Sequence, residues 1–373
     1  MTSASTRIVA SPIALRLSTS SRPDTVQELA ELIQSHNVTY IRGPPKSGKT
    51  ELALLLRHHL KESGRSVIYH NDWPPPNKDP RDTRTACGML IEHAQDEGHE
   101  IGHTDMFCMD VFWILDNVHH TYHEETFWTG FIRGFPNTRY NGVCLLAQQG
   151  DPYFGIDVLS FDPFASHDQA WFQMQQRVSI VPKFDTPNSP QFGLYFTRSE
   201  FNDYVHRFCG HHASTLSLSD SASDFVFNLT RGHPSAVAAV LVVLQQVVDL
   251  SRNVKDSCPF EKSRIQEFLD GKHREFFLGL RNTPFGETLP SSATLDQPSI
   301  ACLREVVLKG SIPWKSLDGG TRRCVQEGWL YTDFPGVRTC PDDLVCTFPT
   351  PLHARMTQYL LSTLRRQKWI SMH

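Results

Sequence analysis

Residues 43–50, Gly-Pro-Pro-Lys-Ser-Gly-Lys-Thr, constrain the fold of this chain more than any other segment. They match G-x-x-x-x-G-K-[ST], the pattern of a phosphate-binding loop between a strand and a helix. Glycines allow the tight backbone bend that turns successive N–H groups toward phosphate oxygens. The pattern therefore predicts a nucleotide-binding loop made of Gly43, Pro44, Pro45, Lys46, Ser47, Gly48, Lys49 and Thr50.

The last two residues of this loop have expected roles of their own. We expect Lys49 to place its ammonium on the β- and γ-phosphates of ATP, and Thr50 to offer its hydroxyl to Mg²⁺. The flanking sequence supports this interpretation. A β-rich run over 38–41 leads into the loop, and leucines at helical spacing over 51–62, followed by Gly64, predict the helix that comes next.

The composition indicates a soluble globular protein with large cores, since 39% of its 373 residues are hydrophobic and 20% are charged. A formal net charge of −4 gives no overall attraction to nucleic acid or to an anionic membrane. No apolar run is long enough to span a bilayer. Nine cysteines without C-x-x-C pairs favour reduced thiols and an intracellular location, in the cytoplasm or nucleus.

Residues 1–22 precede the expected α/β domain and contain arginines, serines and threonines but no acid. We expect a flexible leader or an edge strand here, and a mitochondrial transit peptide is the alternative. Asp24 is the expected N-cap of the first helix.

The apolar run 111–115 ends in Asp116, as a central parallel strand does when it delivers a carboxylate to the edge of a sheet. We interpret Asp116 as a Walker B aspartate that holds Mg²⁺ together with Thr50. A buried strand followed by a turn aspartate is the alternative. Asn117 stands where many such ATPases carry a glutamate base, and an amide can orient a water but cannot take its proton. The expected catalytic residues are thus Lys49, Asp116 and Asn117, with slow or weak hydrolysis.

Residues 142–147 form the next expected buried strand, which is followed by Gln148 and Gln149. Either amide is placed to contact the γ-phosphate, and Gln149 is our candidate binding residue; an ordinary strand-end amide is the alternative. Strands separated by helical stretches predict a P-loop NTPase fold of the α/β class over 23–195, with a parallel sheet. The nucleotide is then expected outside the carboxyl ends of the strands.

Beyond the sheet the sequence pattern becomes helical. We expect a helical lid over 196–290, in which Gly232 and Pro234 form the turn that opens the apolar helix 236–248. Helix and strand patterns over 291–373 predict a winged-helix domain with a protein partner. Its acidic wing loop disfavours tight contact with nucleic acid. Because the domain also carries several basic residues, nucleic acid is the alternative partner. The basic residues are Arg322, Arg323, Arg355, Arg365, Arg366 and Lys368.

The order of these segments resembles the crinkler-type P-loop ATPases of fungi and oomycetes, relatives of the STAND class of AAA-like switches. The resemblance covers most of the chain from about residue 13 onward. The matching segments are 42–50, 115–122 with Trp128, 229–234, and the Phe-Pro-x-Pro-Leu-His run over 348–353.

The resemblance implies that Gly232 and Pro234 lie on the adenine side of ATP and that the winged helix moves with nucleotide state. Nucleotide-dependent oligomerisation is a further option for such a protein. Asn117 departs from the family's usual glutamate, and Arg231 from its usual small or polar residue. We therefore expect an ATP-binding switch that hydrolyses slowly. A catalytically inactive interaction module and a nucleic-acid-associated protein are the alternatives.

Overall fold

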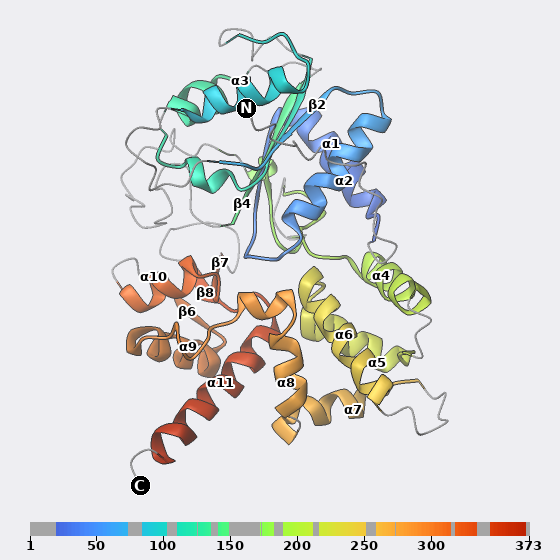
Figure 1. Cartoon of the computed structure of the whole chain (residues 1–373), viewed down its shortest axis with the longest axis vertical. Helices are drawn as coiled ribbons and strands as arrows, with labels where there is room; N and C mark the ends of the chain where they lie inside the picture. The colour runs from blue at the N-terminus through green and yellow to red at the C-terminus, as the bar shows by residue number, and fades with distance from the viewer. Residues whose placement is uncertain are drawn as a thin grey trace, which may run out of the picture.

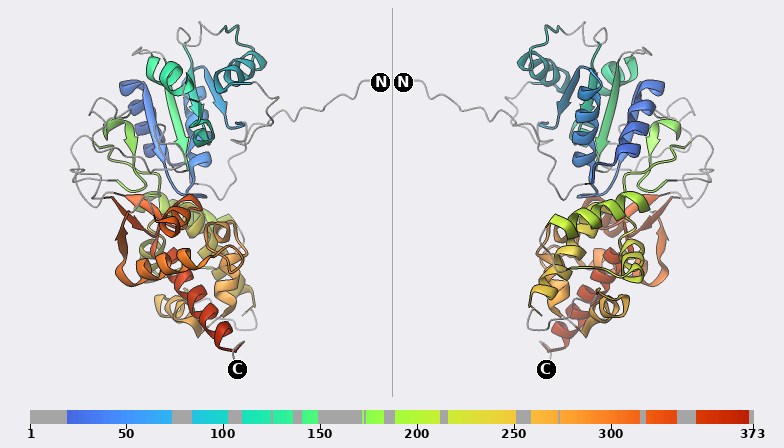
Figure 2. Two further views of the ribbon diagram at one scale, coloured as in Figure 1. Left: turned by 90° about the vertical axis from the view of Figure 1, so that its left-hand side faces the viewer. Right: turned by 90° about the vertical axis from the view of Figure 1, so that its right-hand side faces the viewer.

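An α/β domain lies above a helical lid and a C-terminal region in Figure 1, and both of these regions contact the phosphate-binding loop of the domain. Figure 2 shows the same arrangement from two sides. The structure is a computed structural model. It describes residues 20–73, 84–102, 110–124, 126–135, 141–148, 172, 174–182, 189–211, 216–250, 259–272, 274–314, 318–333 and 344–370.

The central sheet has five parallel strands in the order β2-β3-β4-β1-β5, which confirms the predicted α/β class. β4 lies between β1, which leads into the phosphate-binding loop, and β3, which leads into Asp116. The loop, Asp116 and the end of β4 therefore meet at one edge of the sheet. The strands are β1 (Val38–Arg42), β2 (Val67–His70), β3 (Phe112–Leu115), β4 (Gly142–Ala147) and β5 (Arg177–Val178).

Both faces of the sheet are covered, so its strands read as continuous apolar runs rather than alternating ones. Ile114 packs with α1 (Pro23–His36) and α2 (Lys49–Glu62) in one core. Its neighbour Trp113 packs on the other face, against α3 (Ala86–Asp96) and a π-helical turn over Phe127–Ile132.

The first helix begins two residues earlier than expected, because Arg22 is its N-cap and Pro23 its first residue; Asp24 lies inside the first turn and is not the cap. Arg22 is buried, pairs with Glu200 at 3.1 Å, and donates to the carbonyls of Gly193, Leu194 and Tyr195. Arg22, the last residue of the predicted leader, thus binds residues 193–195, the segment that connects the sheet to the lid. Residues 1–19 lie outside the described part.

The lid is built around α6, whose residues 236–244 are all apolar and pack among neighbouring helices. The same core takes in Leu352 and Met356, so the lid and the C-terminal region share one packed interior. The helices of the lid are α4 (Arg198–His211), α5 (Asp220–Thr230), α6 (Pro234–Leu250), α7 (Lys262–Glu267) and α8 (Arg274–Arg281), with a π-helical turn at Phe268–Lys272 and a 3-10 turn at Pro284–Thr288.

The C-terminal region combines three helices with a three-stranded antiparallel sheet of order β6-β8-β7. The sequence predicted helices and strands over 291–373, and the described part of this region contains both. Its description as a winged helix stays a prediction, and the expected wing loop lies outside the described residues. None of the helices in the described segments is long and apolar enough to cross a membrane. The elements are α9 (Gln297–Lys309), β6 (Ser311–Pro313), α10 (Gly319–Gln326), β7 (Tyr331–Asp333), β8 (Val345–Thr347) and α11 (Pro351–Ile370).

Candidate nucleotide-binding site

The backbone of the phosphate-binding loop requires glycine at two positions. Gly48 has φ of +91°, in the left-handed region where a side chain is strained. Gly43 is needed for a different reason, since a Cβ there would overlap Leu194 and lie 2.9 Å from Ser47 Oγ. The Gly43 N–H donates to Ala147 O at 3.1 Å, which fixes the start of the loop to the end of β4.

Lys49 is a buried cation at the centre of the loop. Its side chain is 7% exposed, and Nζ donates to Gly43 O and Pro44 O at 2.8 Å each. Burial lowers the pKa of Lys49 to about 8, although the nearby Asp116 carboxylate acts in the opposite direction. The ammonium is therefore still charged at neutral pH. Its hydrogen-bond partners are all neutral, since the third one is Ser47 Oγ at 3.4 Å. A buried charge of this kind gains most from an anionic ligand.

Thr50 and Asp116 are joined across the edge of the sheet, as the sequence predicted. Thr50 Oγ1 donates to Asp116 Oδ2 at 2.5 Å, while Asp116 Oδ1 accepts from the Asn117 N–H at 2.8 Å. The Trp73 indole holds the backbone of Asp116 by donating to its carbonyl at 2.5 Å. A hydroxyl and a carboxylate side by side are oxygen ligands of the kind that Mg²⁺ prefers, so the two residues fit that ion.

Asn117 lies beside this pair in a left-handed conformation, with φ of 56° and ψ of 28°. Asparagine tolerates that conformation better than glutamate does, which gives a structural reason for the residue at this position. Glu124, seven residues further along the chain, accepts the Ala86 N–H at 2.6 Å and so caps α3. The Asn117 amide cannot take a proton, and the Glu124 carboxylate is engaged with α3.

His119 was missed by the sequence analysis. It is 7% exposed, and its Nδ1 accepts the Gln148 N–H at 3.4 Å, so the end of β4 meets the turn after β3 at this ring. Burial, then His120, then the charge of Lys49 lower the pKa of His119 to about 3. Its position three residues after Asp116 was the available signal. Gln149, the predicted phosphate contact, lies outside the described residues.

The lid reaches the loop through the predicted Gly232–Pro234 turn. Pro234 packs on Gly48 so closely that a Cβ on Gly48 would lie 2.9 Å from Pro234 Cγ. Gly232 O accepts the Phe196 N–H at 2.9 Å, which ties the turn to the segment that leaves the sheet. Arg231, the departure from the family pattern, is the exposed C-cap residue of α5. The structure thus brings the turn to the loop, and its contact with adenine stays a prediction.

The C-terminal region also lies directly on the loop. Arg42 Nη2 donates to Thr332 O at 3.0 Å, and its guanidinium lies 5.3 Å from the centre of the Tyr331 ring. Lys46 Nζ is 2.8 Å from Glu287 Oε2 of the 3-10 turn that ends the lid. The lid and the C-terminal region therefore both meet the α/β domain at the loop and at the strand end before it.

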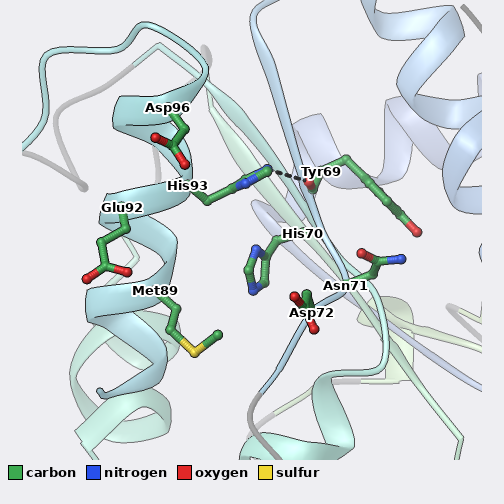
Figure 3. Close-up of a pocket in the computed structure, with 8 residues that line it drawn as sticks. All are labelled: Tyr69, His70, Asn71, Asp72, Met89, Glu92, His93 and Asp96. Atoms are coloured by element: carbon green, nitrogen blue, oxygen red, sulfur yellow. Dashed lines mark hydrogen bonds between the residues drawn. The ribbon is translucent and has the colours of Figure 1, made fainter. Parts of the chain in front are cut away.

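An open groove of about 280 Å³ lies beside the site, between the end of β2 and α3 (Figure 3). His93 Nε2 donates to Tyr69 O at 2.9 Å across its floor, and the Tyr69 hydroxyl donates to Asp116 Oδ2 at 3.4 Å. The groove carries three carboxylates and no cation, so it does not suit a triphosphate. Its lining residues are Tyr69, His70, Asn71, Asp72, Met89, Glu92, His93 and Asp96.

No model of a known protein family matches this sequence, and no curated protein matches it. Several solved structures are similar to this one. The Walker-type ATPase PABY2304 of Pyrococcus abyssi has 11% identity and a TM-score of 0.44 over 92% of this chain and 100% of that one. The RuvB Holliday junction branch migration motor of Thermotoga maritima has 11% identity and a TM-score of 0.41 over 85% and 92%. The ORC2 protein of Aeropyrum pernix has 12% identity and a TM-score of 0.36 over 91% and 92%.

Proposed function

We propose that this chain binds ATP with Mg²⁺ at the phosphate-binding loop and works as a nucleotide-dependent switch with slow hydrolysis. The observation that carries the proposal is Lys49, a buried ammonium held only by neutral groups inside a loop of left-handed and close-packed glycines. In the proposed complex the N–H groups of residues 43–50 and the Lys49 ammonium bind the phosphates. Thr50 and Asp116 hold Mg²⁺, which screens the phosphate charge when it is bound.

The switch is proposed from the position of the loop under both the lid and the C-terminal region. Pro234 and Glu287 of the lid and Thr332 of the C-terminal region each contact a different loop or strand-end residue. A ligand that enters between these residues changes their contacts. The equilibrium between the arrangement with the contacts formed and the arrangement with them broken shifts by as much as the ligand's affinities for the two differ. The crinkler-type and STAND resemblance supports the same proposal, with Gly232 and Pro234 beside adenine and a C-terminal winged helix that presents a protein partner. Nucleic acid remains the less favoured partner.

The binding part of the proposal is tested by titrating ATP into wild type, Lys49→Ala and Lys61→Ala in the presence of Mg²⁺. Lys61 is an exposed lysine of the same helix, so its variant controls for loss of charge alone. We expect Lys49→Ala to weaken ATP binding by about tenfold or more, as loss of a charge-assisted hydrogen bond does. Equal affinity in Lys49→Ala and wild type would exclude the site.

A catalytically inactive interaction module is the second candidate, and Asn117 and Glu124 favour it. Asn117 carries no base, and the Glu124 carboxylate is held by the Ala86 N–H. The two candidates differ in turnover. Steady ATP hydrolysis that is lost in Asp116→Ala would exclude the inactive module, whereas ATP binding without turnover would support it.

The variants Asn117→Asp and Asn117→Glu test whether the site lacks only a general base for ATP hydrolysis. Aspartate tolerates the left-handed backbone at Asn117, while glutamate costs about 1–2 kcal/mol there. If the site is otherwise assembled, we expect a carboxylate at this position to raise turnover by about a hundredfold, the lower end of the effect of a general base.

A further inference from the structure

Two buried polar atoms beside the loop have no hydrogen-bond partner among the described residues, His233 Nε2 and the Tyr195 hydroxyl. His233 is 0% exposed and Tyr195 is 1% exposed. Their rings lie 4.9 Å apart, so they form one cluster rather than two isolated defects. Leaving a buried polar atom unpaired is costly, and two such atoms in neighbouring rings next to the loop favour a ligand that pairs them.

The hydrogen bonds of His233 decide which kind of ligand its free nitrogen requires. His233 precedes α6, and its Nδ1 accepts the Ala236 N–H at 3.3 Å, as an N-cap side chain does. Burial lowers the pKa of His233 to about 3; its own backbone carbonyl opposes that shift, and the charge of Lys49 adds to it. The ring is therefore neutral with its proton on Nε2. The unpaired atom is a donor that requires an acceptor.

The neighbouring imidazole does not provide that acceptor. His353 lies 5.4 Å from His233 between ring centres, and both of its nitrogens are already in use. Thr288 donates to Phe285 O, so His353 Nε2 must donate to Thr288 Oγ1 at 3.1 Å. Its Nδ1 then accepts from Thr350 Oγ1 at 2.7 Å. His353 is a structural residue that joins the start of α11 to the lid.

Each of the two unpaired groups is next in sequence to a residue that packs on the loop. His233 is followed by Pro234, which packs on Gly48, and Tyr195 follows Leu194, which packs on Gly43. Lys49 directly follows Gly48 in the sequence and is close enough to His233 to act on its charge state. The cluster therefore offers a cation and two neutral donors, a combination that suits phosphate oxygens rather than a cationic ligand.

We propose that His233 and Tyr195 are phosphate-binding residues, which donate to the phosphate oxygens of the bound nucleotide from the lid and from the segment that connects lid and sheet. This inference rests on the proposed function. Both groups are covered in the present conformation, so they reach phosphate only when the lid moves relative to the loop. Phosphate binding and lid position are then linked through the same two side chains.

The test compares His233→Asn, His233→Gln and Tyr195→Phe with wild type, using ATP and inorganic tripolyphosphate as ligands. Asparagine keeps the acceptor that caps α6 but lacks the Nε2 donor, whereas glutamine places an amide N–H near the position of Nε2. We expect His233→Asn and Tyr195→Phe each to weaken both ligands by about tenfold, as loss of one hydrogen bond to a charged group does. His233→Gln should recover part of the loss.

Three outcomes would overturn the inference, and each is distinct. Unchanged affinities in His233→Asn and Tyr195→Phe, with binding lost in Lys49→Ala, would remove it while leaving the proposed function intact. A loss seen with ATP but not with tripolyphosphate would assign the two residues to the base or ribose. No binding of either ligand by wild type would remove the proposed function and the inference together. Thermal unfolding without ligand identifies a variant that is misfolded. If His233→Asn is misfolded, Tyr195→Phe tests the inference by itself, because it also removes a proposed phosphate donor.

Discussion

Thr50 Oγ1 and Asp116 Oδ2 lie 2.5 Å apart, so the helix after the phosphate-binding loop is bonded directly to the strand end that follows β3. The two residues are 66 positions apart in the chain. Their contact joins two separate motifs at one point of the sheet edge, and it is the contact that a bound Mg²⁺ would replace.

Asp116→Asn should therefore remove the effect of Mg²⁺ on ATP affinity. The amide keeps the shape of the carboxylate but not its charge. We therefore expect the ratio of ATP affinities with and without Mg²⁺ to be smaller than in wild type by about tenfold or more. The measurement is ATP affinity with Mg²⁺ and with a chelator. Asp72→Asn, in the exposed groove beside the site, is the matched control. A full response to Mg²⁺ in Asp116→Asn would contradict the assignment.

Gly328→Ala should separate the C-terminal region from the loop. A Cβ at Gly328 would lie 2.6 Å from Pro45 Cγ, so either Pro45 or the segment before β7 has to move. Gly310→Ala is a close control, because Gly310 also has positive φ, +81° against +74°, but an added Cβ there meets nothing within 4 Å.

Both alanine variants carry the backbone cost of about 1 kcal/mol, and we expect Gly328→Ala to lose a further 1–3 kcal/mol, roughly the cost of overpacking. Urea unfolding gives the two free energies, and the rate of nucleotide release reports the effect on the site. If the two variants behave alike, the Pro45–Gly328 contact does not hold the C-terminal region in place.

Arg22→Met should destabilise the protein far more than Arg207→Met. Arg22 is buried and its loss leaves the Glu200 carboxylate uncompensated, a change that costs about 3–5 kcal/mol. Arg207 is an exposed residue that pairs with Asp203 one helical turn away, and such a pair contributes less than about 1 kcal/mol. Chemical denaturation of the two variants measures the difference, and similar values would show that the Arg22 cluster is not structural.

The sheet and the Thr50–Asp116 contact could be predicted from the sequence because local patterns specify both. A glycine-rich loop needs a strand before it and a helix after it, and an apolar run ending in aspartate identifies β3. Arg22 could not be assigned, because its partners Glu200 and Leu194 lie more than 170 positions away. His233 and Tyr195 were missed for the same reason, since their importance lies in what surrounds them and not in their spacing.

The buried histidines make stability sensitive to acid. The folded-state pKa of His233 is about 3 and that of His353 lies well below its usual value, in both cases because burial disfavours the charged ring. Both rings protonate in the unfolded chain near pH 6.5, so the unfolded state binds more protons below that pH. The contribution of His233 to stability is complete above pH 6.5 and is lost as the pH falls toward 3, at about 1.4 kcal/mol per pH unit. His353 acts in the same direction.

His233→Asn keeps the cap of α6 but removes the titrating ring. The free energy of unfolding should therefore fall less steeply with falling pH, by about 1.4 kcal/mol per pH unit. His206→Asn, at an exposed position of α4, should leave the slope unchanged. Urea unfolding at several values between pH 7.5 and pH 4.5 measures all three slopes. The same slope in His233→Asn and wild type would mean that His233 is accessible to protons in the folded protein, and it would also weaken the assignment of its Nε2 as a buried donor.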